Sequence, residues 1–189
     1  MYEVVCFIDD DREIQAGAVN GIPVLSLDSA YGRFPEAKVA FGIGAPKTRQ
    51  WAVEKAEGVG FGFETIIHPS VQYSDTVHFG AGVAVCAGSI LTTNIAVGQH
   101  VQINLSCTIG HNVLIDEYAT LSPGVHVSGF VRIGKRVFIG TGAVIINGTD
   151  ERPLTIGDDV VIAAGACVTR SIGPALLVGG VPAKVLKKV

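Results

Sequence analysis

The sequence has no excess of basic residues. Its 14 Lys and Arg residues are outnumbered by 17 Asp and Glu residues, which gives a formal net charge of −3. Three lysines lie near the C-terminus (Lys184, Lys187 and Lys188), too few to form an extended basic surface. Because nucleic-acid binding depends on clustered positive charge, this composition argues against nucleic acid as the main partner.

The sequence also lacks long apolar segments and paired cysteines. The apolar run Val4–Ile8 ends at Asp9, and no segment approaches the roughly 20 apolar residues that span a bilayer. The four cysteines lie far apart and form no CxxC pair: Cys6, Cys86, Cys107 and Cys167. Isolated, reduced thiols are typical of cytosolic proteins. We therefore expect a soluble, cytoplasmic protein without a membrane partner.

What the sequence does contain is a six-residue repeat that runs without interruption from Ile67 to Val144. In these thirteen hexads the first position is always apolar, and the fifth is always small or β-branched. The fourth position often holds Gly or Asn, which tolerate positive φ at a corner. A helix cannot give a strict period of six, but short strands joined at fixed corners can. Three such faces make one coil of eighteen residues, so the pattern predicts a parallel β-helix.

Residues 1–60 follow a different pattern. We expect strands at Tyr2–Ile8 and Lys38–Ile43, a short extended piece at Gly21–Leu25, and a helix at Pro46–Glu57. This order is typical of a small α/β nucleotide-binding unit. The GxG of residues 42–44 either approaches a phosphate or lets the strand turn into the helix. The expected domains are a partial α/β nucleotide- or sugar-binding domain over 1–60 and a β-helix over 61–189 that ends in a C-terminal cap.

The hexads are interrupted once, at residues 145–155, and resume at Ile156. This interval has eleven residues where one hexad would need six, so it carries a five-residue insertion. The insertion is polar and contains Gly148 and Pro153, which predicts a loop that projects from the β-helix.

A coil of eighteen residues predicts which positions stack. Residues i and i+18 should lie roughly 4.8 Å apart, as in neighbouring strands. His111 then stacks on Gly129, and Asn112 on Asn94, while the insertion brings Thr141 next to Ala164. An imidazole beside an uncovered backbone N–H is minimal equipment for acyl transfer, because the base takes a proton while the N–H holds the oxyanion.

Three segments resemble one known family: the run Ile103–Gly134, the later IGTGAV, and the ending VGGVPAKV. They are similar to the bacterial sugar O-acyltransferases, which include sialic acid O-acetyltransferases and the N-acetyltransferases of 4-amino-sugar nucleotides. The segments YEVVCFIDDD and NGIPVL also resemble the N-terminal nucleotide-binding domain of that family. The resemblance implies a left-handed β-helix, a homotrimer, and acetyl-CoA bound between neighbouring β-helices without a metal.

The resemblance also implies residue roles. The catalytic base aligns with His111, with Asn112 beside it, and the amide that holds the acetyl carbonyl aligns with Gly129. Further backbone contacts to CoA align with Thr141 and Ala164. Lys184 lies in the C-terminal segment, where its ammonium could meet a phosphate of CoA as a point charge.

The expected acceptor is a sugar or a sugar nucleotide. Asp9 and Asp10 end a predicted strand, where nucleotide-binding folds often place an acid on ribose hydroxyls. A solvated acidic turn explains them equally well. The sequence does not choose between O- and N-acetylation.

Three features depart from the family pattern. Family members commonly carry a carboxylate directly after the catalytic histidine, where this chain has Asn112, and often a second histidine, where it has Thr120. The first strand and glycine-rich turn of the N-terminal domain have no counterpart in this sequence. Asn112 is also explained as a corner residue with positive φ.

Two other functions are compatible with hexapeptide repeats. A γ-class carbonic anhydrase needs three convergent histidines, two of them five residues apart. No two histidines of this chain have that spacing, and the residue five beyond His111 is Asp116. A non-catalytic scaffold or binding module is the second alternative, favoured by Asn112. The interpretation that accounts for most residues is an acetyl-CoA-dependent acetyltransferase that acts on a sugar or sugar nucleotide.

Overall fold

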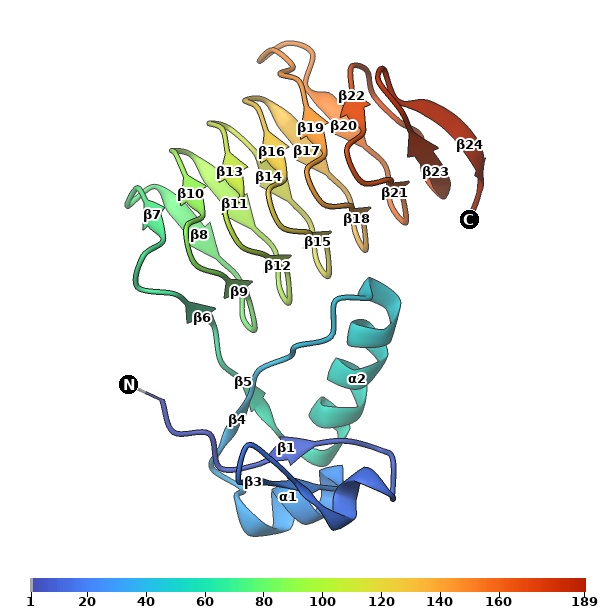
Figure 1. Cartoon of the computed structure of the whole chain (residues 1–189). Helices are drawn as coiled ribbons and strands as arrows, with labels where there is room; N and C mark the ends of the chain where they lie inside the picture. The colour runs from blue at the N-terminus through green and yellow to red at the C-terminus, as the bar shows by residue number, and fades with distance from the viewer. Residues whose placement is uncertain (1) are drawn as a thin grey trace. The chain divides into compact units, whose positions relative to one another are not determined.

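The computed structural model describes residues 2–189, and the chain divides into two compact units (Figure 1). The first contains the chain up to Val39 together with Trp51–Phe63. The second contains Ala40–Gln50 and Glu64–Val189. Residues 40–50 were expected in the N-terminal domain, whereas the structure groups them with the β-helix.

The second unit is a left-handed parallel β-helix with three faces. Face I contains β7 (Gln72–Tyr73), β10 (Ile90–Leu91), β13 (Thr108–Ile109), β16 (His126–Val127), β19 (Val144–Ile145) and β22 (Cys167–Val168). Face II contains β8 (Val77–Phe79), β11 (Ile95–Val97), β14 (Leu114–Ile115), β17 (Val131–Ile133) and β20 (Leu154–Ile156). Face III contains β6 (Ile66–Ile67), β9 (Ala84–Val85), β12 (Gln102–Ile103), β15 (Thr120–Leu121), β18 (Phe138–Ile139), β21 (Val161–Ile162), β23 (Leu176–Gly179) and β24 (Lys184–Lys188).

The strand register confirms the coil of eighteen residues. Thr108 pairs with Ile90 on one side and with His126 on the other, eighteen positions away in each direction. Where paired strands lie on either side of the insertion, the sequence separation of paired residues increases to 23, as in the pair Phe138–Val161. The first- and fifth-position side chains together form the core, with Ile103 and Val101 both fully buried. The first coil is the exception, because its Tyr73 is 50% exposed.

The last two strands form a hairpin at the C-terminal end of face III. β23 pairs in parallel with β21, and β24 then pairs antiparallel with β23. The turn between them contains a cis peptide bond before Pro182. The apolar segment around Pro182 thus covers the last coil as a strand pair, and all of β24 is exposed.

Residues 40–50 are fastened to the β-helix by Arg49, which is 1% exposed. Its guanidinium donates to the carbonyl oxygens of His100 (2.9 Å), Tyr118 (2.6 Å) and Ile43 (2.6 Å). Burial lowers the pKa of Arg49 to about 10, so the group stays charged at neutral pH. A buried charge surrounded by this many acceptors is satisfied, whereas removing it would leave several carbonyls unpaired.

The same contacts explain the GxG of residues 42–44. The carbonyl of Gly44 accepts from the Thr120 hydroxyl at 2.8 Å, and the carbonyl of Phe41 accepts from the Gln102 side chain at 2.7 Å. Neither Gly42 nor Gly44 has positive φ, and a Cβ would meet no atom within 4 Å at either position. This segment therefore packs on face III, and the fold does not require glycine at either position. Thr120, which stands where the family often has a histidine, is 1% exposed beneath it.

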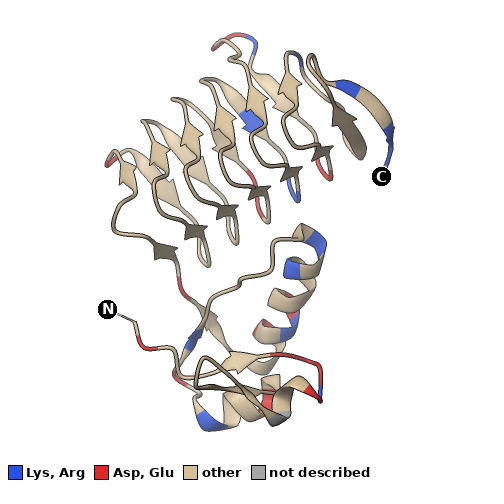
Figure 2. Ribbon diagram, in the orientation of Figure 1, with Lys and Arg blue, Asp and Glu red and all other residues tan. Residues whose placement is uncertain are grey.

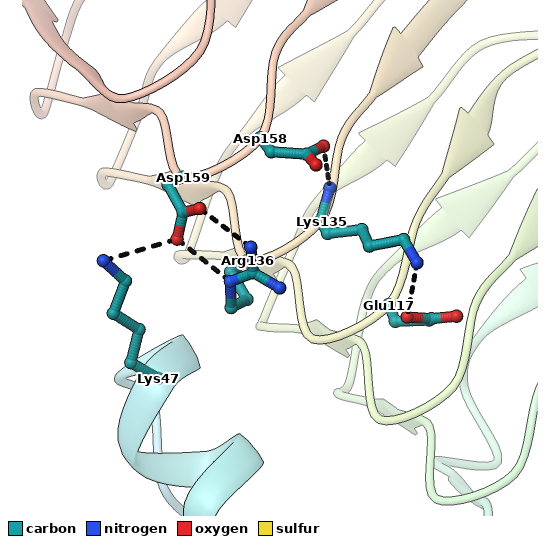
Figure 3. Close-up of polar contacts among 6 residues, drawn as sticks. All are labelled: Lys47, Glu117, Lys135, Arg136, Asp158 and Asp159. Carbon is teal, nitrogen blue, oxygen red and sulfur yellow. Dashed lines mark hydrogen bonds and ion pairs between the residues drawn. The ribbon is translucent and has the colours of Figure 1, made fainter.

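Charged residues alternate along the corner between faces II and III (Figures 2 and 3). Arg136 and Asp159 form a bidentate pair, with Nε and Nη2 3.0 and 2.8 Å from the two carboxylate oxygens. Hydrogen bonds from Arg136 lower the pKa of Asp159. Lys47, in the first turn of α2, reaches the same carboxylate at 3.4 Å. Bidentate geometry adds specificity to these partly exposed pairs, which individually contribute little to stability.

His100 gives the β-helix a pH-dependent stability. The ring is 1% exposed and stacks on Tyr118 with centroids 5.3 Å apart. Burial and then the charge of Arg49 lower its pKa below the usual 6.5. Between the folded and unfolded pKa values the unfolded chain binds more protons, so stability is complete above pH 6.5 and decreases as pH falls below it.

We expect His100→Asn to remove part of this dependence, because Asn tolerates the positive φ of 55° and does not titrate. Urea denaturation at a series of pH values between about 7 and 5 would measure the slope. A smaller loss of unfolding free energy on acidification in the variant is expected. An unchanged slope would assign the dependence to other groups.

The first unit is a small α/β arrangement. It contains β1 (Phe7–Ile8), a 3-10 turn (Ile14–Ala16), β2 (Ala18–Val19), β3 (Ile22–Leu25), α1 (Leu27–Arg33), β4 (Lys38–Val39), most of α2 (Pro46–Val59) and β5 (Gly62–Phe63). β1 and β3 are parallel, as are β4 and β5, while β2 is antiparallel to β3.

Two expected strands are shorter than predicted, one helix was not expected, and one expected helix is confirmed. The strand expected at Lys38–Ile43 is only β4 (Lys38–Val39). The first strand is only two residues long, and Tyr2, Val4 and Phe7 are exposed rather than buried. The helix α1, capped by the hydroxyl of Ser26, was not predicted. The helix expected from Pro46 is confirmed as α2. Within residues 2–189, no helix is both long and apolar enough to cross a membrane.

Candidate active site

His111 lies at the corner between faces I and II, in the turn that connects β13 to β14. Gly129 occupies the same corner one coil later, between β16 and β17. A Cβ added to Gly129 would lie 2.7 Å from Nε2 of His111 and 2.8 Å from Cε1. The imidazole therefore covers Gly129 directly, and the predicted stacking is confirmed. Only glycine leaves room for the ring in this position.

Asn112 orients the ring. Its Oδ1 lies 3.1 Å from Nδ1 of His111. An amide oxygen only accepts hydrogen bonds, so this contact favours the tautomer with the proton on Nδ1, which leaves the lone pair on Nε2, the nitrogen above Gly129. Asn112 itself has a φ of 57° and stacks on Asn94, whose φ is 53°. Asn112 thus serves both as a corner residue and as a hydrogen-bond acceptor for the imidazole.

A groove of about 670 Å³ begins at this corner and extends over face II. Asn112 and Phe130 line it, together with Arg132 and two residues of the insertion, Asp150 and Pro153. The ring of Phe130 meets His111 edge to face, with centroids 5.0 Å apart at 90°. Phe130 and Arg132 were not expected from the sequence, because the hexad pattern marks them only as a corner residue and an outward-facing strand residue.

The five-residue insertion projects from the same corner, in the coil after Gly129. The N–H of Gly148 donates to the carbonyl of Gly129 at 3.0 Å, and that of Leu154 donates to the carbonyl of Phe130 at 3.0 Å. The two ends of the loop therefore hold the backbone of Gly129 and Phe130. The loop predicted from the sequence is confirmed, and it adjoins the His111 corner.

Thr141 and Ala164 are neighbours on a different corner, between faces III and I. The N–H of Gly165 donates to the carbonyl of Thr141 at 2.9 Å, which places Ala164 in the next coil as predicted. Both residues are exposed. The predicted cofactor-binding residues therefore form two groups on this chain. Gly129 lies at the corner between faces I and II, Thr141 and Ala164 lie at the corner between faces III and I, and face I separates the two groups.

Lys184 lies on β24 and lines a hollow of about 140 Å³ at the C-terminal end of the β-helix. Arg170 lines the same hollow, and nothing in the hexad pattern marks this residue. Arg170 follows β22 on the corner between faces I and II, which is the corner of His111. Two cationic side chains therefore border one hollow beyond the insertion.

Asp9 and Asp10 belong to the first unit, where they follow β1. Both are exposed, and the Asp10 carboxylate pairs with Lys55 at 2.8 Å. Asp9 accepts the N–H of Asp11 at 2.9 Å, which closes the acidic turn. Among residues 2–189, no group of three or more His, Cys, Asp or Glu side chains could hold a metal ion.

Comparisons with known proteins identify similar enzymes, although no protein-family model matches the chain. GDP-perosamine N-acetyltransferase of Escherichia coli O157:H7 is 34% identical over 185 residues, which cover 96% of this chain and 82% of that protein. A solved structure of perosamine N-acetyltransferase from Caulobacter crescentus, a histidine variant in complex with CoA and GDP-perosamine, is 32% identical with a TM-score of 0.88. It covers 97% of this chain and 85% of its own.

A second solved structure has the same fold. The acetyltransferase domain of PglB from Neisseria gonorrhoeae, in complex with acetyl coenzyme A, is 32% identical with a TM-score of 0.85. The match covers 96% of this chain and 85% of that one. In each of these cases the similarity includes the first unit as well as the β-helix.

Proposed function

Because this chain belongs to the hexapeptide-repeat family of bacterial sugar acetyltransferases, we propose that it transfers the acetyl group of acetyl-CoA to the amino group of a nucleotide-activated sugar. The observation that carries this proposal is the corner formed by His111, Asn112 and Gly129, which combines an oriented base with a backbone N–H that donates no hydrogen bond among residues 2–189. The relatives named as GDP-perosamine N-acetyltransferases support an amine as the acceptor group.

In the proposed mechanism, Nε2 of His111 takes a proton from the acceptor amine as its nitrogen attacks the thioester carbonyl. The new C–N bond produces a tetrahedral oxyanion, which the N–H of Gly129 stabilises. Within residues 2–189 this N–H donates no hydrogen bond, so it is available to the substrate. Collapse of the intermediate breaks the C–S bond and releases CoA thiolate, which takes the proton from the imidazolium. No acyl-enzyme forms.

Asn112 makes this base differ from the usual family arrangement. Its amide oxygen fixes the tautomer of His111, but a neutral amide does not stabilise the imidazolium by charge. The transition state therefore depends more on the precise orientation of the ring and on Gly129.

The two groups of cofactor-binding residues support a homotrimer. Gly129 and Thr141 lie on different corners of one chain. One CoA molecule would contact both kinds of residue if the Gly129 corner of one chain faced the Thr141 corner of a neighbouring chain. Face I, between these corners, exposes Ile90 (41%) and Val144 (38%), and Leu105 is 51% exposed on the Thr141 corner. Burial of such apolar side chains favours association. We place acetyl-CoA in this shared cleft, with Ala164 beside the pantetheine arm.

Charged side chains suggest where the phosphates of CoA and the ribose of the acceptor nucleotide bind. Arg170 and Lys184 would face the phosphates of CoA at the C-terminal hollow. Asp9 and Asp10 would hold ribose hydroxyls of the acceptor nucleotide, with Asp10 exchanging its partner Lys55 for the ligand. The first unit is then the nucleotide-binding domain, and the enzyme works in the cytoplasm with small-molecule substrates.

A panel of acceptors tests the proposed function. We expect purified protein to release CoA from acetyl-CoA in the presence of amino-sugar nucleotides such as GDP-perosamine. Hydroxyl-sugar nucleotides of the same nucleotide are expected to be poor acceptors, since the proposal assigns an amine nucleophile. A thiol-reactive dye would measure the released CoA. Release with every hydroxyl sugar and with no amino sugar would overturn the assignment.

A further inference from the structure

Phe130 has an unusual backbone for its side chain. Its φ is 55°, in the left-handed region that Gly and Asn favour and bulky residues avoid. The two preceding coils have Asn94 and Asn112 at the equivalent position. A phenylalanine here adds nothing to the core of the β-helix, because its ring is only partly buried and lines the groove over face II. Positive φ also occurs at other corners, as at Tyr118 (60°) and Arg136 (56°), so what distinguishes Phe130 is the place of its ring in this groove beside His111.

The ring of Phe130 contacts the proposed base. It meets His111 edge to face at 5.0 Å and 90°, the geometry preferred by aromatic pairs. Asn112 contacts the Nδ1 edge of the imidazole, and Gly129 lies under Nε2. A hydrogen bond by itself leaves a ring free to tilt about the bond. The aromatic contact supplies the second constraint, which fixes the tilt.

The insertion holds Phe130 in place. The N–H of Phe130 donates to the carbonyl of His111 at 3.0 Å, and its own carbonyl accepts from Leu154 at 3.0 Å. A Cβ at Gly148 would lie 2.5 Å from the Phe130 carbonyl oxygen, so the loop packs closely against this backbone. The strained residue is therefore fixed from both neighbouring coils.

We propose that Phe130 is a positioning residue, whose ring holds the imidazole of His111 in the orientation that keeps Nε2 over Gly129. The inference rests on the proposed function, because it assigns a purpose to an oriented His111. It also gives the insertion a purpose, which is to support the strained backbone of Phe130 beside the reacting groups.

Three substitutions separate positioning from folding. Phe130→Leu keeps an apolar side chain without a ring, Phe130→Asn introduces the residue that the corner prefers, and Phe130→Tyr retains the ring. We expect Phe130→Leu and Phe130→Asn to lower kcat roughly 3- to 10-fold, the factor that corresponds to the free energy of an aromatic pair. The KM for acetyl-CoA should not change. Tyr should restore kcat to within about twofold. The Tm of Phe130→Asn should equal or exceed that of wild type.

The control is Ala175→Gly, which relieves positive φ (55°) at the corner between faces II and III. It should raise Tm without changing kcat. A readout independent of activity is the NMR order parameter of the His111 ring in the resting protein. We expect it to fall in Phe130→Leu and to recover in Phe130→Tyr. An unchanged order parameter would overturn the positioning role, whereas a lowered order parameter in a protein that acetylates no sugar would refute only the proposed function.

Discussion

Replacing His111 with alanine is expected to lower turnover by roughly 10²–10⁴-fold, the usual contribution of a general base. The affinity for acetyl-CoA should change little, because the imidazole acts on the acceptor proton and the thioester is held by the amide of Gly129. Initial rates of CoA release with GDP-perosamine would measure the first quantity, and calorimetric titration with acetyl-CoA the second.

The matched control is His68→Ala. His68 lies on the first coil, where its Nδ1 contacts the Ser70 hydroxyl at 2.9 Å. This variant removes an exposed histidine far along the helix from the proposed site and should keep wild-type turnover. A His111→Ala enzyme with the same turnover as His68→Ala would refute the general-base mechanism.

Replacing Gly129 with valine is expected to have the largest effect, a loss of at least about 10³-fold in turnover together with weaker acetyl-CoA binding. The Cβ of valine would lie 2.7 Å from Nε2 and 3.1 Å from Cδ2 of His111, so the ring has to move. The new side chain also occupies the space beside the amide that binds the acetyl carbonyl. One substitution thus displaces the base and blocks the oxyanion site.

The reason for this loss is steric rather than conformational. Gly129 does not have positive φ, so valine can adopt its backbone conformation and the fold should persist. Gly58→Ala in α2 is the control, because a Cβ there meets no atom within 4 Å and Gly58 lies outside the proposed site. Circular dichroism would check that both variants retain the β-helix. Wild-type affinity for acetyl-CoA in Gly129→Val would place the thioester elsewhere.

The period of the sequence predicted the β-helix because each coil repeats one local rule. An apolar first position and a corner-forming fourth position determine the register, so the pairing of His111 with Gly129 followed from counting residues. The same counting gave the five-residue insertion and the neighbours Thr141 and Ala164. In the first coil of the repeat, burial departs from the pattern. Tyr73 is exposed there because no preceding coil covers its side chain.

Contacts outside the repeat were not predictable in this way. Arg49 donates to carbonyl oxygens of His100 and Tyr118, which are 51 and 69 residues away. Every residue has a carbonyl, so the sequence carries no sign of which ones an arginine binds. The attachment of residues 40–50 to face III therefore became visible only in the structure.

Phe130 was missed for the opposite reason. The repeat assigns its position to a corner and predicts Gly or Asn, so a phenylalanine reads as a tolerated exception. Its importance depends on the contact with His111, which requires the direction of both side chains. Departures from a local rule are informative at such positions, since natural sequences tend to break these rules at functional sites.

The central claim is direct transfer of an acetyl group from CoA to an amine at the His111–Gly129 corner. Its most direct test follows acetyl-CoA labelled with ¹³C at the carbonyl by NMR while the wild-type enzyme acts on GDP-perosamine. The account predicts that the thioester carbonyl signal is replaced by an amide carbonyl signal of the sugar nucleotide, without a protein-bound acyl signal and with the conversion almost absent in His111→Ala. Conversion to acetate or to an ester, or equal conversion by His111→Ala, would contradict it.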